Sequence, residues 1–169
     1  MKYLIPVNSP KAALAPIEHL IAANRRGAPI EALLLNVQRP FSRRASQLSR
    51  KAARDEYHAE CSRSVMASAI ELLSRTGIPF RAMTQIGSPA ERIAAVAKMQ
   101  RVDEILMGVE RHARPLEWLL PSMPQAVVAR TDVPVVVLGR GRVNATEDYL
   151  LWAGLAGAAG LCALLLAAD

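Results

Sequence analysis

The stretch GSPAERIAAVAKMQRVDEILMG, residues Gly87 to Gly108, contains a helix start, a helix and the strand that follows it. Ser88 is a preferred N-cap residue, Pro89 suits the first helical position, and Glu91 follows the cap by three residues, as in a capping box. The apolar run that ends at Gly108 is short, as in a buried strand. The stretch therefore predicts one helix-to-strand unit of a parallel sheet.

The same alternation extends along the rest of the chain. Short apolar or alternating runs predict strands at residues 3–7, 30–37, 78–86, 102–108 and 133–139. Helical spacing of apolar residues predicts helices that begin at Pro10, before residue 64, at Pro89 and near Pro124, and Gly27 and Gly77 end the first two. Five strands and four helices in alternation predict an α/β fold: a five-stranded parallel sheet with helices on both faces.

The predicted topology also indicates where a ligand would bind. In open parallel sheets, ligands bind at the carboxyl ends of the strands, near the point where the strand order reverses. The loops that follow Val7, Val37 and Met107 lie at those ends. We therefore expect a site at these three loops.

Composition narrows the function classes. The chain has 169 residues, only 4% aromatic residues and a net charge of +6, which suits one domain with an aliphatic core. Six basic residues lie between positions 39 and 54 without an acidic one, and we interpret them as a solvated helix face, with contact to anionic lipid as the alternative. Phe41 is the only aromatic residue in that run, which argues against nucleic acid. The two cysteines imply no disulfide framework and favour a reducing compartment.

Candidate catalytic and metal-binding residues are few. His58 and Cys61 lie three residues apart on a predicted helix, but no second pair of ligands accompanies them, so we interpret them as a coincidence on the helix surface. Ser122 lacks the glycines of a nucleophile elbow. The sequence predicts no catalytic residue and no metal site.

Several stretches resemble the universal stress protein family. They are LIPVNSP (4–10), LLLNV (33–37), GSPAERI (87–93), VDEILMG (102–108) and RTDVPVVVL (130–138), and they occur in the order of the family. The resemblance covers residues 1–140 and implies a flavodoxin-like domain. It also implies a homodimer that pairs through the fifth strand.

Family members that bind ATP carry a glycine, two residues, a second glycine, nine residues, and a third glycine followed by Ser or Thr. The same spacing here holds Gly108, Arg111, Pro121 and Ser122, so only the first and last positions match. Pro121 has no N–H to donate, and Arg111 places a bulky side chain where the backbone should approach a phosphate. The resemblance therefore implies a degenerate nucleotide loop.

A nucleotide site would need a defined set of residues in this chain. Asn8 stands where nucleotide-binding relatives carry an aspartate, and Val37 ends the second predicted strand. With Gly108, Arg111 and Ser122, these residues would hold ATP or AMP if either binds. We expect no resident cofactor, and ATP is the alternative.

The C-terminal segment differs from the rest of the chain. Residues 149–168 are twenty residues without a charge, and a helix of that length reaches roughly 30 Å, the thickness of a bilayer core. Tyr149 and Trp152 resemble interfacial anchors, and Arg140 and Arg142 precede them on the side expected in the cytoplasm. We predict a linker at 141–148 and a transmembrane helix at 149–168. The alternative is a soluble cytoplasmic protein whose tail is buried in an oligomer interface.

Three functions follow from these observations. The first is a membrane-tethered regulatory or binding protein that docks on a membrane-protein partner. The second is a nucleotide-binding stress sensor or weak ATPase in which Arg111 contacts phosphate. The third is an accessory subunit of a larger membrane complex.

Overall fold

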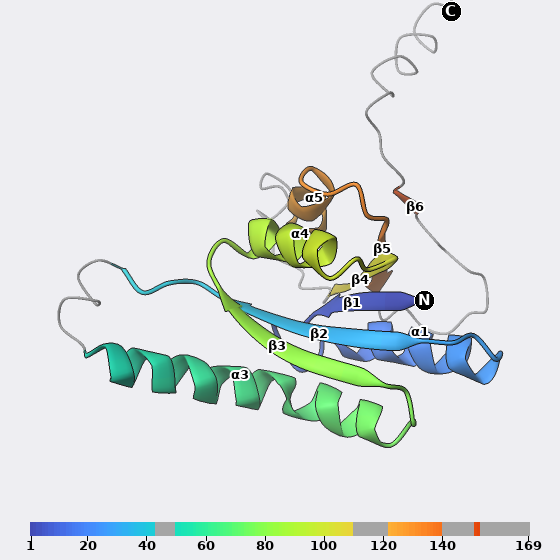
Figure 1. Cartoon of the computed structure of the whole chain (residues 1–169), viewed down its shortest axis with the longest axis horizontal. Helices are drawn as coiled ribbons and strands as arrows, with labels where there is room; N and C mark the ends of the chain where they lie inside the picture. The colour runs from blue at the N-terminus through green and yellow to red at the C-terminus, as the bar shows by residue number, and fades with distance from the viewer. Residues whose placement is uncertain (43–49, 110–121, 140–150, 153–169) are drawn as a thin grey trace, which may run out of the picture.

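The computed structural model describes residues 1–42, 50–109, 122–139 and 151–152. Its strands and helices alternate along the chain as far as β5 (Figure 1). They are β1 (Lys2–Pro6), α1 (Leu14–Arg25), β2 (Glu31–Gln38), α3 (Lys51–Ser74), β3 (Phe80–Ile86), α4 (Pro89–Met99), β4 (Glu104–Val109), α5 (Met123–Val128), β5 (Val135–Gly139) and β6 (Leu151–Trp152).

The strands form one sheet in the order β3-β2-β1-β4-β5-β6. The pairs from β3 to β5 are all parallel, as the alternation of strands and helices predicts. Chain order runs in one direction from β1 to β3 and in the other from β4 to β5, so the strand order reverses between β1 and β4. That reversal is the place where open α/β sheets bind ligands.

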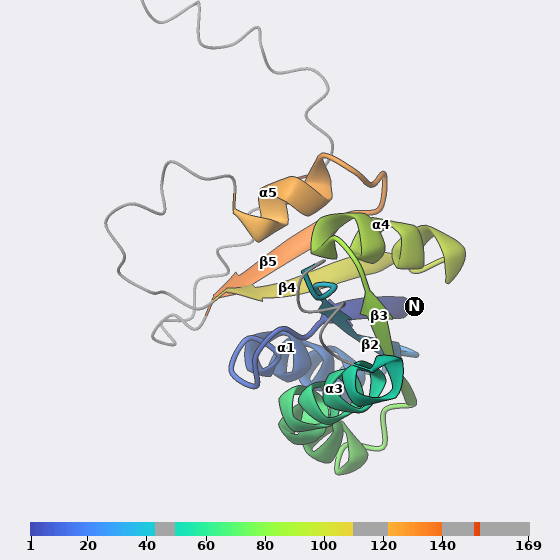
Figure 2. The same ribbon diagram turned by 90° about the vertical axis from the view of Figure 1, so that its left-hand side faces the viewer.

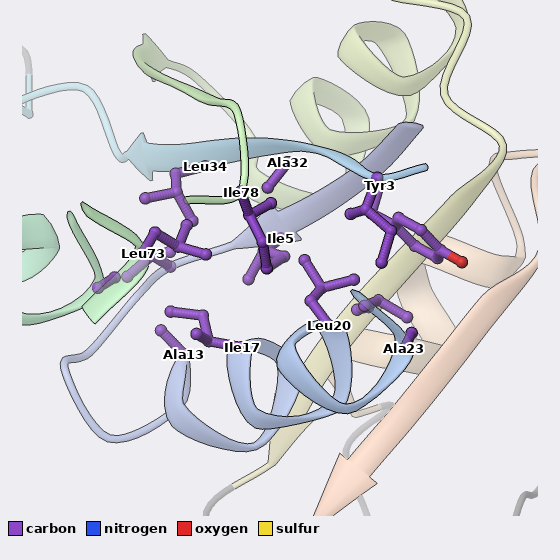
Figure 3. Packing of buried hydrophobic residues seen from close by; sticks show 14 of the residues in the cluster. Tyr3, Ile5, Ala13, Ile17, Leu20, Ala23, Ala32, Leu34, Leu73 and Ile78 are labelled. Carbon is purple, nitrogen blue, oxygen red and sulfur yellow. The ribbon is translucent and has the colours of Figure 1, made fainter. Parts of the chain in front are cut away.

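Helices cover both faces of the sheet. Figure 2 shows α1 and α3 on one face and α4 and α5 on the other. Side chains along β1 alternate between two cores: Tyr3 and Ile5 pack with α1 and α3, and Leu4 packs with α4. Figure 3 shows the first core, in which Ile17 and Leu20 of α1 are fully buried under the strands. Complete burial of such a side chain contributes about 1.5–3 kcal/mol to the free energy of unfolding. The cores on the two faces therefore both stabilise the sheet.

The structure corrects one predicted helix start and one predicted cap. The first helix begins at Leu14 rather than Pro10, because residues 9–13 form a turn in which the Ser9 hydroxyl oxygen accepts the Ala12 N–H at 3.1 Å. Helix α4 does begin at Pro89 after Ser88, but the Ser88 side chain makes no capping hydrogen bond. The capping box predicted there is therefore wrong.

The C-terminal segment is described at two residues. Leu151 and Trp152 form β6, which runs antiparallel to β5 and pairs with Val136 and Val135. The transmembrane helix predicted at 149–168 stays a prediction. The linker and the other tail residues lie outside the described part of the chain. Within the described ranges, no helix is both long and apolar enough to cross a membrane.

Candidate functional site

A cavity of about 720 Å³ opens at the carboxyl ends of β1 and β4, at the reversal of strand order. We call it the switch-point cleft. Four of the five predicted site residues line it: Asn8 after β1, Val37 in β2, Gly108 in β4, and Ser122 before α5. The fifth, Arg111, lies outside the described residues. The topology therefore brings together residues that are far apart in the sequence.

The walls of the switch-point cleft are mostly apolar. They include Leu35 of β2, Ile93 of α4 and Met107 of β4. Arg39, whose side chain is exposed, is the one charged residue among its described lining. That described lining offers no carboxylate, imidazole or thiol for acid–base or nucleophilic chemistry. The switch-point cleft is therefore suited to bind a ligand that carries little charge.

Gly108 has a structural reason to be glycine. A Cβ built on Gly108 would lie 1.7 Å from the carbonyl oxygen of Ala12 and 3.1 Å from Cδ of Pro16. The turn before α1 therefore contacts the backbone of β4 directly. Because any other residue would push this turn away, the first glycine of the loop pattern is required by packing, whether or not a phosphate binds.

Ser122 caps α5 with its own polar groups. Its side chain accepts the N–H of Gln125 at 3.5 Å, and its N–H donates to Oε1 of Gln125 at 2.9 Å, so the two residues form a capping box. Pro124, in the first turn, has no N–H. The N–H groups of Ser122 and Gln125 are thus already satisfied within the chain. The spacing of Ser122 and Gln125 is itself a capping-box signature, which our sequence analysis missed.

A chain of hydrogen bonds joins β1, β2 and α3 beside the cleft. Nδ2 of Asn36 donates to the carbonyl oxygen of Val7 at 2.7 Å, and Oδ1 of Asn36 accepts from Nε2 of Gln38 at 3.0 Å. Nε2 of Gln38 also donates to the carbonyl oxygen of His58 at 2.7 Å. Oε1 of Gln38 lies 2.5 Å from Nδ1 of His58. We call this set the amide relay.

The amide relay corrects one prediction. His58 is only 8% exposed, so it is a buried residue rather than one on the helix surface. Asn36 is 4% exposed, and both buried side chains are satisfied by hydrogen bonds. The sequence does contain a signal: Asn36 and Gln38 are polar at alternate positions of the otherwise apolar stretch 32–38, which puts them on the same face. The partner of Gln38 in α3, His58, lies twenty residues away, and the sequence does not identify it.

A second, smaller cavity of about 320 Å³ adjoins the amide relay. We call it the α3 pocket. Phe41, Tyr57 and His58 bring three rings to it, with ring centroids 4.8 Å apart for Phe41 and His58 and 5.5 Å apart for Phe41 and Tyr57. A hydrogen bond with the Cys61 side chain raises the pKa of Tyr57. Asn8, Val37 and Arg39 line both cavities, so the two are neighbours.

Metal binding has no support in the described part of the chain. No three His, Cys, Asp or Glu side chains there lie close enough together to hold an ion. His58 and Cys61 both line the α3 pocket, yet no third ligand joins them among the described residues. Structural metal sites commonly need four ligands.

Comparisons with solved structures give the fold. A universal stress protein family protein from Arabidopsis thaliana with AMP bound is 18% identical, with a TM-score of 0.59 over 88% of this chain and 97% of that one. The universal stress protein UspA from Lactobacillus plantarum is 19% identical, with a TM-score of 0.64 over 82% and 97%. A universal stress protein in complex with cAMP is 16% identical, with a TM-score of 0.60 over 82% and 96%. A search of curated proteins finds no match.

The sequence itself gives the family. Residues 1–139 match the Universal stress protein family, which is most of the chain and includes every strand from β1 to β5. The match covers the segments on which the resemblance rests and both cavities. The chain therefore belongs to the universal stress protein family.

Proposed function

We propose that the switch-point cleft binds the nucleoside part of an adenine nucleotide, and that the protein acts by binding and regulation. The observation that carries this proposal is the asymmetry of the cleft. On one side, Asn8 and Val37 stand beside apolar walls that suit a base. On the other side, the capping box of Ser122 and Gln125 satisfies the N–H groups that a phosphate would need.

The loop pattern supports the same conclusion. A phosphate cradle depends on backbone N–H groups that point at the ligand. Pro121 and Pro124 have none, and the N–H of Ser122 donates to Gln125. Two solved structures with the same fold hold AMP or cAMP, which makes an adenine nucleotide the first ligand to test. We expect its phosphates to contribute little to the affinity here.

Calorimetric titration with adenosine, AMP and ATP tests this proposal. We expect the three dissociation constants to agree within about threefold, since a tenfold difference would mean about 1.4 kcal/mol from the phosphates. Asn8→Ala should weaken all three ligands, and Asn24→Ala, at the end of α1 and outside the cleft, is the matched control. ATP that binds more than tenfold tighter than adenosine would contradict the proposal, as would the absence of any binding.

Gln125→Ala sharpens the test. The substitution frees the N–H of Ser122 from the Gln125 side chain, so ATP should gain affinity relative to adenosine. Because Gln125 itself does not line the cleft, a uniform change for both ligands would mean that the cap does not govern phosphate binding.

The tail supports a second proposal, tethering to a membrane. The twenty uncharged residues at 149–168 favour it, with the domain on the cytoplasmic side and a membrane protein as its partner. Leu151 and Trp152 cannot belong to β6 and to a spanning helix at the same time. Tethering therefore requires β6 to leave the sheet.

Membrane fractionation tests the tether. Full-length protein should stay with carbonate-washed membranes, and a chain that ends at Val143 should not. If both forms stay in the supernatant, the tether is wrong. If detergent extracts the full-length protein together with a stoichiometric membrane protein, the accessory-subunit function gains support.

A further inference from the structure

We propose that the α3 pocket is a second ligand site, which takes a small planar aromatic ring that carries one O–H or N–H donor. The proposal concerns a cavity other than the switch-point cleft and does not depend on nucleotide binding. It rests on three observations: the direction of the hydrogen bonds in the amide relay, the gathering of rings, and the size and charge of the pocket.

The amide relay fixes which nitrogen of His58 carries the proton. The carbonyl oxygen of Val7 can only accept, so Asn36 must present Nδ2 to it and Oδ1 to Gln38. Gln38 then donates through Nε2 and has only Oε1 left for His58. Nδ1 of His58 is therefore the donor. In the neutral imidazole the other nitrogen, Nε2, is then an acceptor.

This acceptor belongs to a residue that lines the α3 pocket. In metal sites, a hydrogen bond from one ring nitrogen orients the imidazole so that the other nitrogen can bind. A metal would need further ligands, and no group of three is found in the described residues. A ligand that donates one hydrogen bond needs only the one acceptor.

The rings provide the apolar part of the site. The whole chain is only 4% aromatic, yet Phe41 and Tyr57 lie together beside the His58 ring. Tyr57 is 56% exposed, which leaves its surface available to a ligand. Aromatic side chains in this spacing bind planar rings by offset or edge contacts.

Size and charge limit the ligand further. A cavity of about 320 Å³ lies at the low end of the range for small-molecule sites, so it suits one or two rings and excludes a whole nucleotide. Arg39 is the single charged residue among the described lining, and it favours a neutral or anionic ligand. A hydroxylated aromatic acid meets all of these requirements.

NMR titration of the full chain with 4-hydroxybenzoate and with benzoate tests the proposal. The two probes differ by one hydroxyl group, so the difference between them measures the donor. We expect 4-hydroxybenzoate to shift the ring signals of His58 and Tyr57, with a Kd of about 1 mM. Benzoate should bind about fivefold more weakly, as the loss of one neutral hydrogen bond predicts.

Two substitutions separate the acceptor from the rings. His58→Asn keeps a donor for Oε1 of Gln38 but removes the Nε2 acceptor, so the preference for 4-hydroxybenzoate over benzoate should disappear while the fold persists. Tyr57→Ala should weaken both probes. Met99→Ala, at a residue that is 64% exposed and lies outside the pocket, is the control for loss of a large exposed side chain.

The proposal is overturned if the wild-type protein binds the two probes equally. It is also overturned if His58→Asn keeps the preference for the hydroxyl group. Shifts at Gly108 and Ser122 without shifts at His58 would place the probe in the switch-point cleft and would overturn it as well. Adenosine binding in the switch-point cleft is measured separately, by calorimetry.

Discussion

The switch-point cleft and the α3 pocket are neighbours that share three lining residues, yet they are built differently. The cleft is formed mainly by backbone: the ends of the strands, the close approach of the Ala12 carbonyl to Gly108, and the capped start of α5. The pocket depends on side chains, which form a directed set of hydrogen bonds. The backbone arrangement of the fold therefore determines the shape of the cleft. A few particular side chains of this sequence determine the polarity of the pocket.

The largest effect should come from Gly108→Ala. The new Cβ would overlap the carbonyl oxygen of Ala12, so the turn before α1 must move, at a cost of about 3 kcal/mol in the free energy of unfolding. Gly139→Ala is the matched control, because its Cβ would meet only Cγ2 of Val109 at 3.6 Å. Urea denaturation measures both. Equal stabilities would show that the cleft does not depend on this contact.

Gln38→Leu should break the amide relay with a smaller effect. It leaves Oδ1 of Asn36 and Nδ1 of His58 without their partner, and the free energy of unfolding should fall by about 2 kcal/mol. Gln85→Leu, in the neighbouring edge strand β3, is the control and should change stability less. If the two variants unfold alike in urea, the relay contributes nothing specific to the pocket.

Ser122→Ala tests the capped helix of the cleft. Loss of the capping box should lower the free energy of unfolding by about 1 kcal/mol. Ser88→Ala is the informative control, because Ser88 occupies the N-cap of α4 without a side-chain cap bond and should be nearly neutral. A larger loss at Ser88 than at Ser122 in thermal denaturation would reverse the assignment of the two caps.

The smallest effect concerns Glu104, at the amino end of β4 and away from both cavities. Burial raises the pKa of the Glu104 carboxyl above its ordinary value. The folded protein therefore binds this proton more tightly than the unfolded chain does, and its free energy of unfolding falls as the pH rises through the raised pKa. Glu104→Gln should therefore stabilise the protein at pH 7, by less than about 1 kcal/mol, and the gain should vanish below pH 4. A gain that is the same at both pH values would contradict this origin.

Much of the fold follows from the sequence because its signals are local. Five apolar runs become the five parallel strands, and glycines at positive φ end the first two helices at Gly27 and Gly77. The start of α1 differs from the predicted one, because Pro10 can begin a helix locally but the observed helix begins at Leu14. The turn that delays the helix to Leu14 is packed against Gly108, far away in the chain.

The candidate sites divide in the same way. The rule for strand ends predicts a site at the loops that follow Val7, Val37 and Met107. The family resemblance names Asn8, Gly108 and Ser122 as residues of that site, and with Val37 they line one cleft. The sequence does not predict the α3 pocket, because this pocket depends on a contact between Gln38 and His58 that only the packing of α3 on β2 creates. Local patterns therefore locate the cleft, and tertiary contacts define the pocket.

The pairing of β6 with β5 bears on how the sheet meets other chains. The unpaired edge of a sheet is a template for association, and β6 closes that edge at Val135 and Val136. The homodimer expected through the fifth strand stays a prediction, and it would have to displace β6 or use the rest of β5. The backbone of Leu151 and Trp152 thus covers part of this sheet edge. A chain that ends at Val143 leaves the edge of β5 unpaired, so it should dimerise or aggregate at lower concentration than the full chain.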